Sequence, residues 1–335
     1  MKFIPSNLPE ALSCLNVLEE IRLRYSNGIE TFDGSKPKTN SWFRNKGQSG
    51  GGTRFEFDSS NNLTSSSLNI SQVHYDESDN KAISSATALS TIIHPYHPSI
   101  PSMHMHISMM TKFDNTYYWR IMADLNPSIP NEKDKELFEN TLIDAGEKHA
   151  SLALETGRKY FYIPILNRYR GVSHFYLENY NSSIFEEDLR FAERFGMYVI
   201  TTYLSIINSK KNSLSSPTEE QKKIQLAYHT LYFFQVLILD RGTTVGLLSH
   251  NENDIGIFGS LPKHIDKNLL KSWVSRLSKP QDLLLERLLQ PMPNTGIIEI
   301  DVSLKKVFAE IIRNFYLEYP EVLKFQAESP ISLKK

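Results

Sequence analysis

The chain has 335 residues, with 37 lysines and arginines against 38 aspartates and glutamates, and its formal net charge at pH 7 is -1. This balance gives no basic surface for nucleic acid or for an anionic membrane, so neither partner is expected. No run approaches the roughly 20 apolar residues of a membrane-spanning helix. The single cysteine, Cys14, cannot form an intramolecular disulfide. We expect a cytoplasmic globular protein without a signal peptide and with a large core.

Patterns of apolar residues predict the elements of the first half of the chain. Helical spacing predicts an opening helix over residues 9–25, and the polar segment 26–41 predicts a loop. The glycines at 50–52 are expected to close a further loop that feeds a strand. Alternating patterns predict more strands over 67–75, 101–108 and 115–125. Neighbours in sequence therefore build a sheet.

The second half mixes helices and strands without βαβ repeats. Residues 130–156 and 184–207 predict helices, and the aromatic segment 160–180 predicts strands. The apolar run that begins at Leu231 predicts another strand, which stops at the turn signature Asp240-Arg241-Gly242. Helices around 269–277 and 281–289 and a tail at 297–324 with one strand and one helix complete the chain.

The segment 94–127 contains the strongest local signal, because four histidines lie close together in it. His104 and His106 alternate with apolar residues on a strand, so both point to one face. They could bind a metal together with a carboxylate such as Asp124, or one could be catalytic and the other structural. His94 and His97 are each followed by a proline, and we expect them to fix a loop by hydrogen bonds.

Arginines and glycines supply candidates for binding an anionic group. Arg54, Arg168, Arg170 and Arg241 could bind carboxylates with two parallel hydrogen bonds, or each could form a surface salt bridge. Backbone N–H groups of the glycines at 50–52 could cradle an anion, although neither known phosphate-binding glycine pattern is present. Asp124 could be paired with an arginine or placed to stabilise a cation in a substrate.

Several segments, taken in chain order, resemble the oxygen-dependent coproporphyrinogen III oxidases of haem biosynthesis. Trp42, Arg44 and the glycines at 50–52 resemble the WxR…GGGG segment of that family. The other matches are Asn69-Ile70-Ser71-x-Val73-His74 with NxSxVHG, residues 93–104 with HPxNPxxPTxH, Ala123-Asp124-Leu125-x-Pro127 with ADLTP, Arg170-Gly171-Val172 with RGIGG, residues 240–247 with DRGTxFGL, and Gly259-Ser260-Leu261-Pro262 with a late SLP segment. Order and rough spacing hold over about residues 40–290.

The resemblance implies an α+β fold, a large antiparallel β-sheet flanked by helices on both sides, in a single domain over residues 1–335 with a C-terminal extension at 297–335. It implies an oxidase that converts propionate side chains of a porphyrinogen to vinyl groups by oxidative decarboxylation. O2 would be the co-substrate, and no metal or other cofactor would be obligatory. It also implies a homodimer.

The resemblance assigns roles to individual residues. His104 would be the active-site histidine, Asp124 would bind pyrrole N–H groups, and Arg170 would act in catalysis by binding a carboxylate. We expect further substrate contacts from Gly51, Gly52, Arg54, Arg168, His174 and Arg241.

Departures from the family pattern suggest other functions. Arg120-Ile121-Met122 and Ser173-His174 stand where the family has glycines, which predicts a smaller or differently shaped cavity. One alternative is a metal-dependent oxidase or oxygenase that acts on a smaller substrate, with iron or copper held by His104, His106 and His174. A third possibility is a binding protein without catalytic activity.

Overall fold

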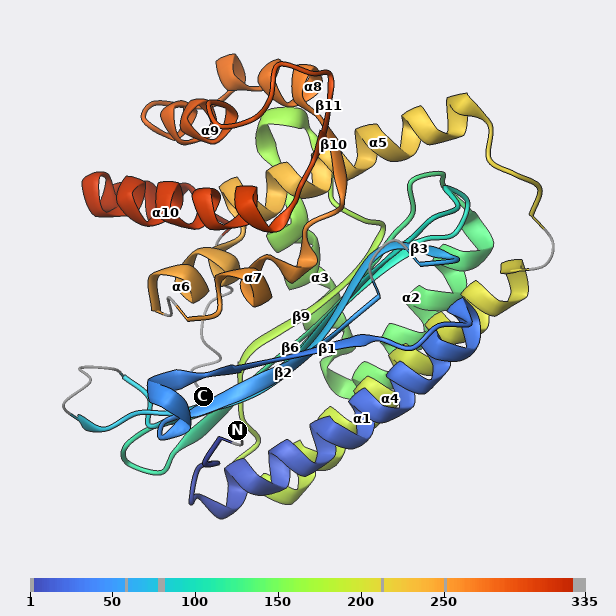
Figure 1. The fold of residues 1–335 in the computed structure, drawn as a ribbon. Helices are drawn as coiled ribbons and strands as arrows, with labels where there is room; N and C mark the ends of the chain where they lie inside the picture. Colours follow the sequence, from blue (N-terminus) through green and yellow to red (C-terminus); the bar gives the residue numbers. More distant parts are fainter. Residues whose placement is uncertain (1–2, 58–59, 78–81, 212–213, 250–251, 328–335) are drawn as a thin grey trace.

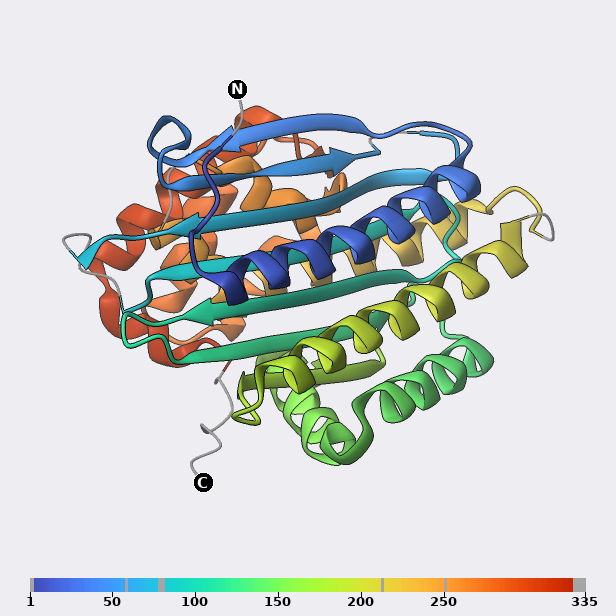
Figure 2. The same ribbon diagram turned by 90° about the horizontal axis from the view of Figure 1, so that it is seen from below.

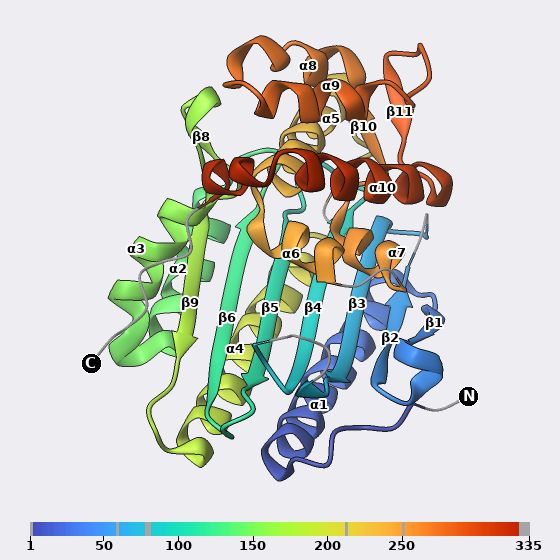
Figure 3. The same cartoon turned by 90° about the vertical axis from the view of Figure 1, so that its left-hand side faces the viewer.

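The computed structural model describes residues 3–57, 60–77, 82–211, 214–249 and 252–327. Its centre is a seven-stranded sheet with strand order β1-β2-β3-β4-β5-β6-β9, in which all neighbours pair antiparallel (Figures 1 and 3). The first six strands follow one another in the chain. The strands are β1 (Lys38–Phe43), β2 (Gly50–Glu56), β3 (Leu63–His74), β4 (Ser85–Pro95), β5 (Ser102–Thr111), β6 (Tyr117–Asn126) and β9 (Ser173–Tyr180).

Two long helices cover one face of the sheet, which we call the helical face. Figure 2 shows α1 (Pro9–Asp33) and α4 (Phe185–Lys211) lying side by side across it. Buried apolar side chains from both helices and from alternate strand positions form one continuous core there. Gly196 on α4 permits the close approach, because a Cβ atom at this position would lie 2.8 Å from the Ile21 side chain of α1 and 3.1 Å from Ile107 of β5.

The C-terminal part of the chain covers the opposite face, which we call the cavity face, and has a second buried apolar core. Figure 3 shows part of this segment in front of the sheet and the rest beyond one end of the strands. The elements are α5 (Glu219–Phe234), α6 (Arg241–Ser249), α7 (Asp254–Ile257), β10 (His264–Asp266), α8 (Lys267–Lys271), α9 (Gln281–Leu289), β11 (Ile297–Glu299) and α10 (Val302–Glu318). The prediction of an antiparallel sheet with helices on both sides is confirmed.

The remaining helices pack along the edge strand β9. They are α2 (Glu132–Gly146) and α3 (Ala150–Phe161), and the short hairpin of β7 (Tyr162–Ile163) and β8 (Arg168–Tyr169) follows them. The sequence predicted one helix over 130–156. The chain instead bends after Gly146, where Glu147 has a φ of 49°, a backbone conformation that a helix does not contain.

Two other predictions are corrected. The run from Leu231 is helical rather than a strand: α5 continues through a π-helical turn, Gln235–Leu239, and α6 follows after the extended residue Asp240. All residues at 228–239 are buried, and a uniformly apolar run does not reveal its period. Residues 26–33 continue α1, since Ile29 and Phe32 face the core, and residues 38–43 form β1 instead of a loop.

Within the described ranges, no single helix is both long and apolar enough to cross a bilayer. One pair of helices bent by 56°, Glu219–Leu239 with Arg241–Ser249, has the necessary combined length and composition.

Candidate active site

A cavity of about 260 Å³ lies between the cavity face of the sheet and the segment from α5 to α7. Side chains alternate along a strand, and the residues of β5 and β6 that line the cavity lie two positions apart. His104 and His106 of β5 both line the cavity, as their spacing predicted. The opposite wall comes from the π-helical turn and from the starts of α6 and α7, with Val236, Gly242 and Asn253 among its residues.

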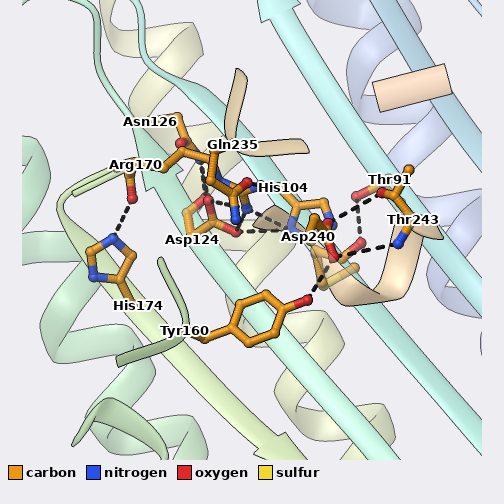
Figure 4. Close-up of polar contacts among 12 residues, drawn as sticks. Thr91, His104, Asp124, Asn126, Tyr160, Arg170, His174, Gln235, Asp240 and Thr243 are labelled. Atoms are coloured by element: carbon orange, nitrogen blue, oxygen red, sulfur yellow. Dashed lines mark hydrogen bonds and ion pairs between the residues drawn. The ribbon is translucent and has the colours of Figure 1, made fainter. Parts of the chain in front are cut away.

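Half-buried His104 and fully buried Asp124 and Arg170 form a cluster at one end of the cavity (Figure 4). The strand register places His104 of β5 directly opposite Asp124 of β6. His104 Nδ1 donates to Asp124 Oδ1 at 2.7 Å, and Arg170 Nη2 donates to both carboxylate oxygens at 2.8 Å. Asn126 Nδ2 donates to Oδ2 at 2.6 Å. Asp124 is therefore paired with an arginine, one of the two roles that the sequence left open.

The charges of this cluster stabilise one another. Burial alone raises the pKa of Asp124, but the Arg170 guanidinium and the hydrogen bond from His104 outweigh it and hold that pKa below its usual range. Arg170 is enclosed between the rings of Phe161 and Tyr232, at 4.2 and 4.6 Å, and its Nη1 donates to Gln235 Oε1 at 2.7 Å. Only 1% of its surface is exposed, so its charge is directed at Asp124.

A second polar group lies further along the same wall. Arg120 of β6 forms an ion pair with Glu178 of β9. Tyr160 of α3 donates its hydroxyl proton to Asp240 Oδ1 at 2.6 Å, and the backbone N–H of Gly242 donates to the same oxygen at 2.7 Å. Arg120 and Met122 both line the cavity, whereas Ile121 between them is buried in the core of the helical face. These side chains occupy space that glycines would leave open.

The three histidines of the alternative metal site do not form one ligand set. His174 Nε2 donates to the backbone oxygen of Arg170 at 2.6 Å (Figure 4), and its ring stacks on Phe161. His174 is not among the residues that line the cavity. His106 shares a hydrogen bond of 2.9 Å with the Ser108 hydroxyl. Burial lowers the pKa of His106 to about 3, aided by the Arg120 charge. No three His, Cys, Asp or Glu side chains among the described residues are placed to hold a metal ion.

The glycines at 50–52 lie within strand β2 and not in a loop, so the prediction of a loop there is wrong. Gly52 pairs with Trp42 of β1. A Cβ atom on Gly52 would come within 2.7 Å of both the indole Nε1 of Trp42 and the backbone oxygen of Ile70. Gly52 thus makes room for the indole, which lines the cavity. Gly51 faces the backbone oxygen of Trp42 in the same way, at 2.5 Å from an added Cβ.

The other predicted anion-binding residues lie away from the cavity wall. Arg54 of β2 is buried and pairs with Glu56 at 2.7 Å, in a neighbouring surface pocket. Arg168 is exposed on β8, and Arg241 is exposed at the start of α6. Neither is among the residues that line the cavity.

His94 and His97 have the hydrogen-bonding roles that the sequence predicted. His94 Nε2 donates to the backbone oxygen of Ser260 at 3.0 Å, and its Nδ1 accepts from the Ser102 hydroxyl at 3.0 Å. His97 Nε2 donates to the backbone oxygen of Ser215 at 2.9 Å. His94, near the end of β4, and His97, in the loop that follows, therefore connect this part of the chain to later segments.

Sequence reasoning missed several residues of the site, among them Tyr160, Tyr176, Tyr232, Gln235 and Asn253. The tyrosines lie in aromatic segments, where the sequence pattern does not distinguish a ring in the core from a ring that lines a cavity. Of these five residues, Gln235 is the one that the sequence could have indicated as part of a polar site. A glutamine inside an otherwise apolar run needs a polar partner when it is buried.

Comparisons with known proteins agree with the fold. The family model of coproporphyrinogen III oxidase matches residues 13–291. The oxygen-dependent coproporphyrinogen-III oxidase of Rickettsia akari (strain Hartford) is 33% identical over 191 residues, which cover 55% of this chain and 66% of the relative. The enzymes of the same name from Francisella tularensis subsp. holarctica (strain OSU18) and Rickettsia bellii (strain OSU 85-389) are 30% and 31% identical over 185 residues each. These matches cover 53% and 54% of this chain and 59% and 64% of the relatives.

The chain thus spans about two thirds, or slightly less, of the length of these relatives. The family model, in contrast, covers most of the chain, from the first helix through all seven strands of the sheet to α9 on the cavity face. The chain belongs to the coproporphyrinogen III oxidase family.

Proposed function

We propose that this protein is an oxygen-dependent oxidase that removes CO2 from a propionate side chain of a pyrrole-containing substrate and leaves a vinyl group. Family membership and the names of the relatives support the reaction type. The observation that carries the proposal is the His104–Asp124 pair, which presents a histidine to the cavity and fixes its tautomer.

Two electrons must leave the substrate in this reaction. One propionic acid side chain and one O2 give one vinyl group, one CO2 and one H2O2, so atoms and electrons balance with O2 as the only oxidant. This balance requires no metal or other cofactor. The proposal therefore includes that the reaction needs neither a metal nor another cofactor.

His104 would handle the proton. An ionised carboxylate can only accept hydrogen bonds, so the proton between the two groups is on Nδ1. Nε2 then carries a lone pair, has no hydrogen-bond partner among the described residues and belongs to a side chain that lines the cavity. This nitrogen can accept the proton that the substrate releases on oxidation, and Asp124 stabilises the resulting imidazolium. Arg170 acts through Asp124 and not on a substrate carboxylate.

Turnover assays test the proposal. Purified protein in air is given coproporphyrinogen or, separately, pyrrole-3-propionic acid, and O2 uptake and CO2 release are followed. We expect one CO2 per O2, and a loss of about 100-fold or more in kcat for His104→Gln, because a positioned general base contributes that much. His97→Gln, in a loop away from the cavity, is the matched control. Absence of turnover of both substrates by the wild-type protein would reject the proposal.

The remaining expectations are part of the same proposal. We propose a cytoplasmic homodimer whose residues 1–335 form one domain. Light scattering on the purified protein at micromolar concentration measures the mass directly, and a monomer mass would reject the dimer. A single cooperative unfolding transition, seen equally by near- and far-UV circular dichroism, is the expected result for one domain.

A further inference from the structure

Few cations at the cavity wall are available to a substrate carboxylate. Among the described residues, the arginines that line the cavity are Arg120 and Arg170. Arg170 has 1% of its side chain exposed and is paired with Asp124, whereas 29% of the Arg120 side chain is exposed. His106 carries no charge at pH 7, because burial lowers its pKa to about 3. Arg120 is therefore the arginine that a substrate carboxylate can reach.

Arg120 uses only part of its guanidinium group within the protein. Nη2 donates to Glu178 of β9, and the donors on Nε and Nη1 have no hydrogen-bond partner among the described residues. Nη1 reaches across the cavity towards the start of α6, because it would lie 4.0 Å from a Cβ atom added to Gly242. Buried donors in native proteins almost always have a partner, and guanidinium groups bind carboxylates by strong charge-assisted hydrogen bonds. The unused donors of Arg120 therefore fit a carboxylate of a ligand.

The position of Arg120 on β6 indicates which carboxylate this is. The strand register places Arg120 opposite Ser108, and Asp124 opposite His104. The two pairs are four positions apart on β6, which corresponds to about 13 Å along the strand. His106 lies between them on β5 and lines the cavity. A propionate group that is oxidised beside His104 is too short to reach Arg120 as well, so the carboxylate at Arg120 belongs to another ring of the substrate.

We propose that Arg120 binds a propionate carboxylate that the reaction leaves intact, and that it thereby selects a substrate with carboxylates on more than one pyrrole ring. Coproporphyrinogen, which has a propionate on each ring, meets this requirement. This role deepens the proposed function and rests on it for the place of the reacting propionate, beside His104. Arg120 stands where the family pattern has a glycine, so relatives that keep the glycine do not share the contact.

Glu178 competes with the substrate for the same guanidinium group. Its side chain is 5% exposed, and its Oε2 has no hydrogen-bond partner among the described residues. Because two carboxylates beside one cation repel each other, Glu178 weakens the binding of the substrate carboxylate. Replacing Glu178 by glutamine should therefore tighten substrate binding, whereas an ion pair with a purely structural role predicts no such gain.

Anaerobic titration calorimetry of the full chain tests the contact without turnover, because coproporphyrinogen is not oxidised by this reaction when O2 is absent. Arg120→Met should weaken binding about tenfold or more, since hydrogen bonds to a charged group are lost. Arg120→Lys should weaken it less, because the charge remains without the planar fork. Glu178→Gln should bind coproporphyrinogen more tightly than the wild-type protein. Unchanged affinity in a folded Arg120→Met variant, or weaker binding by Glu178→Gln, would overturn the inference.

Two further variants complete the binding test. Arg54→Met is the matched control, because Arg54 is also a strand arginine paired with a glutamate but does not line the cavity; its Kd should equal that of the wild-type protein. If Arg120→Met fails to fold because Glu178 has lost its cation, the double variant Arg120→Met, Glu178→Gln removes both charges. The double variant should bind more weakly than Glu178→Gln, and equal affinity of the two would contradict the assignment.

Steady-state kinetics in air distinguish this role from a structural one. The carboxylate at Arg120 keeps its charge throughout the reaction, so the contact is equally strong in the ground state and in the transition state. Arg120→Met should therefore raise the KM for coproporphyrinogen about as much as the Kd, and kcat should stay within about twofold. A decrease in kcat with an unchanged KM would contradict the proposed contact.

The binding and turnover results separate this role of Arg120 from the proposed function. Anaerobic binding that depends on Arg120, together with no turnover of coproporphyrinogen or pyrrole-3-propionic acid in air, would support the contact and reject the oxidase. Turnover of coproporphyrinogen with the same kcat and KM in Arg120→Met as in the wild-type protein would support the oxidase and reject the contact.

Discussion

Replacing Asp124 by asparagine keeps the shape of the side chain and removes its charge. Arg170 would then keep its positive charge with 1% of its surface exposed and no carboxylate beside it. Removing one partner of a buried ion pair costs about 3–5 kcal/mol, mainly because the other charge remains desolvated. The new amide would also place an N–H₂ group near the donors of Arg170, His104 or Asn126. We expect a loss at the upper end of this range.

Urea unfolding at pH 7 measures the loss, and a double variant isolates the pair. Asp124→Asn and Arg170→Met should each destabilise strongly. The double variant should lose about 2–3 kcal/mol less stability than the two single variants lose in sum, because it leaves no unpaired charge. Glu155→Gln is the control, since its partner Lys159 is 75% exposed and such pairs contribute about 0–1 kcal/mol. Additive effects, or a cost for Asp124→Asn as small as that of the control, would refute the reasoning.

The pH dependence gives an independent measurement. The pKa of Asp124 is lower in the folded protein than in an unfolded chain, where it is about 3.9. The carboxylate therefore contributes stability that is fully present above the unfolded value and is lost as the pH falls towards the folded one. The stability gap between wild type and Asp124→Asn should be constant from pH 7 to about pH 5 and narrow below about pH 4. A gap that widens on acidification would contradict this.

Other predictions concern Gln235, Gly52 and the buried histidines. Gln235→Leu should remove the bond to Arg170, cost about 1–2 kcal/mol in urea unfolding and shift the pH profile of kcat, which a purely structural defect would leave in place. Gly52→Ala should destabilise by about 1–3 kcal/mol through its contacts with Trp42 and Ile70, whereas Gly246→Ala, with its nearest neighbour at 3.5 Å, should cost far less. Burial lowers the pKa values of His106 and His174 to about 3 and about 4. Both histidines therefore bind protons more strongly in the unfolded chain than in the folded protein. The free energy of unfolding should thus decrease as the pH falls below about 6.5. This decrease should be less steep in His106→Asn than in the wild-type protein. An equal slope in the two proteins would show that His106 is not the cause.

The strands of the site could be predicted from sequence because their residues obey a simple period. His104 and His106 alternate with methionines, so their common face followed from the pattern alone. Asp124 was recognisable as an acid within an apolar strand. Its partner could not be identified, because the contact between Arg170 and Asp124 depends on β9 pairing with β6, and no local pattern encodes that pairing.

The helical wall of the cavity could not be predicted for a different reason. The run at 228–239 is buried on all sides, so its side chains show neither a period of 3.6 nor a period of 2. As a strand, it would place Tyr232 and Gln235 on opposite faces. As a helix they lie close to one another, and both contact Arg170. The strand at glycines 50–52 was missed for a different reason. Residues without side chains show no alternation of polar and apolar side chains, so their sequence does not indicate a strand.

The order of the strands has a consequence for how the chain folds during synthesis. Strands β1 to β6 are contiguous in sequence and pair with their neighbours, so the sheet can grow as it leaves the ribosome. Asp124 is then in place beside His104, while Arg170 follows 46 residues later. Until β9 docks, this carboxylate has no cation and must stay hydrated. We therefore expect the nascent sheet to keep its cavity face open until the C-terminal helices pack on it and complete the site last.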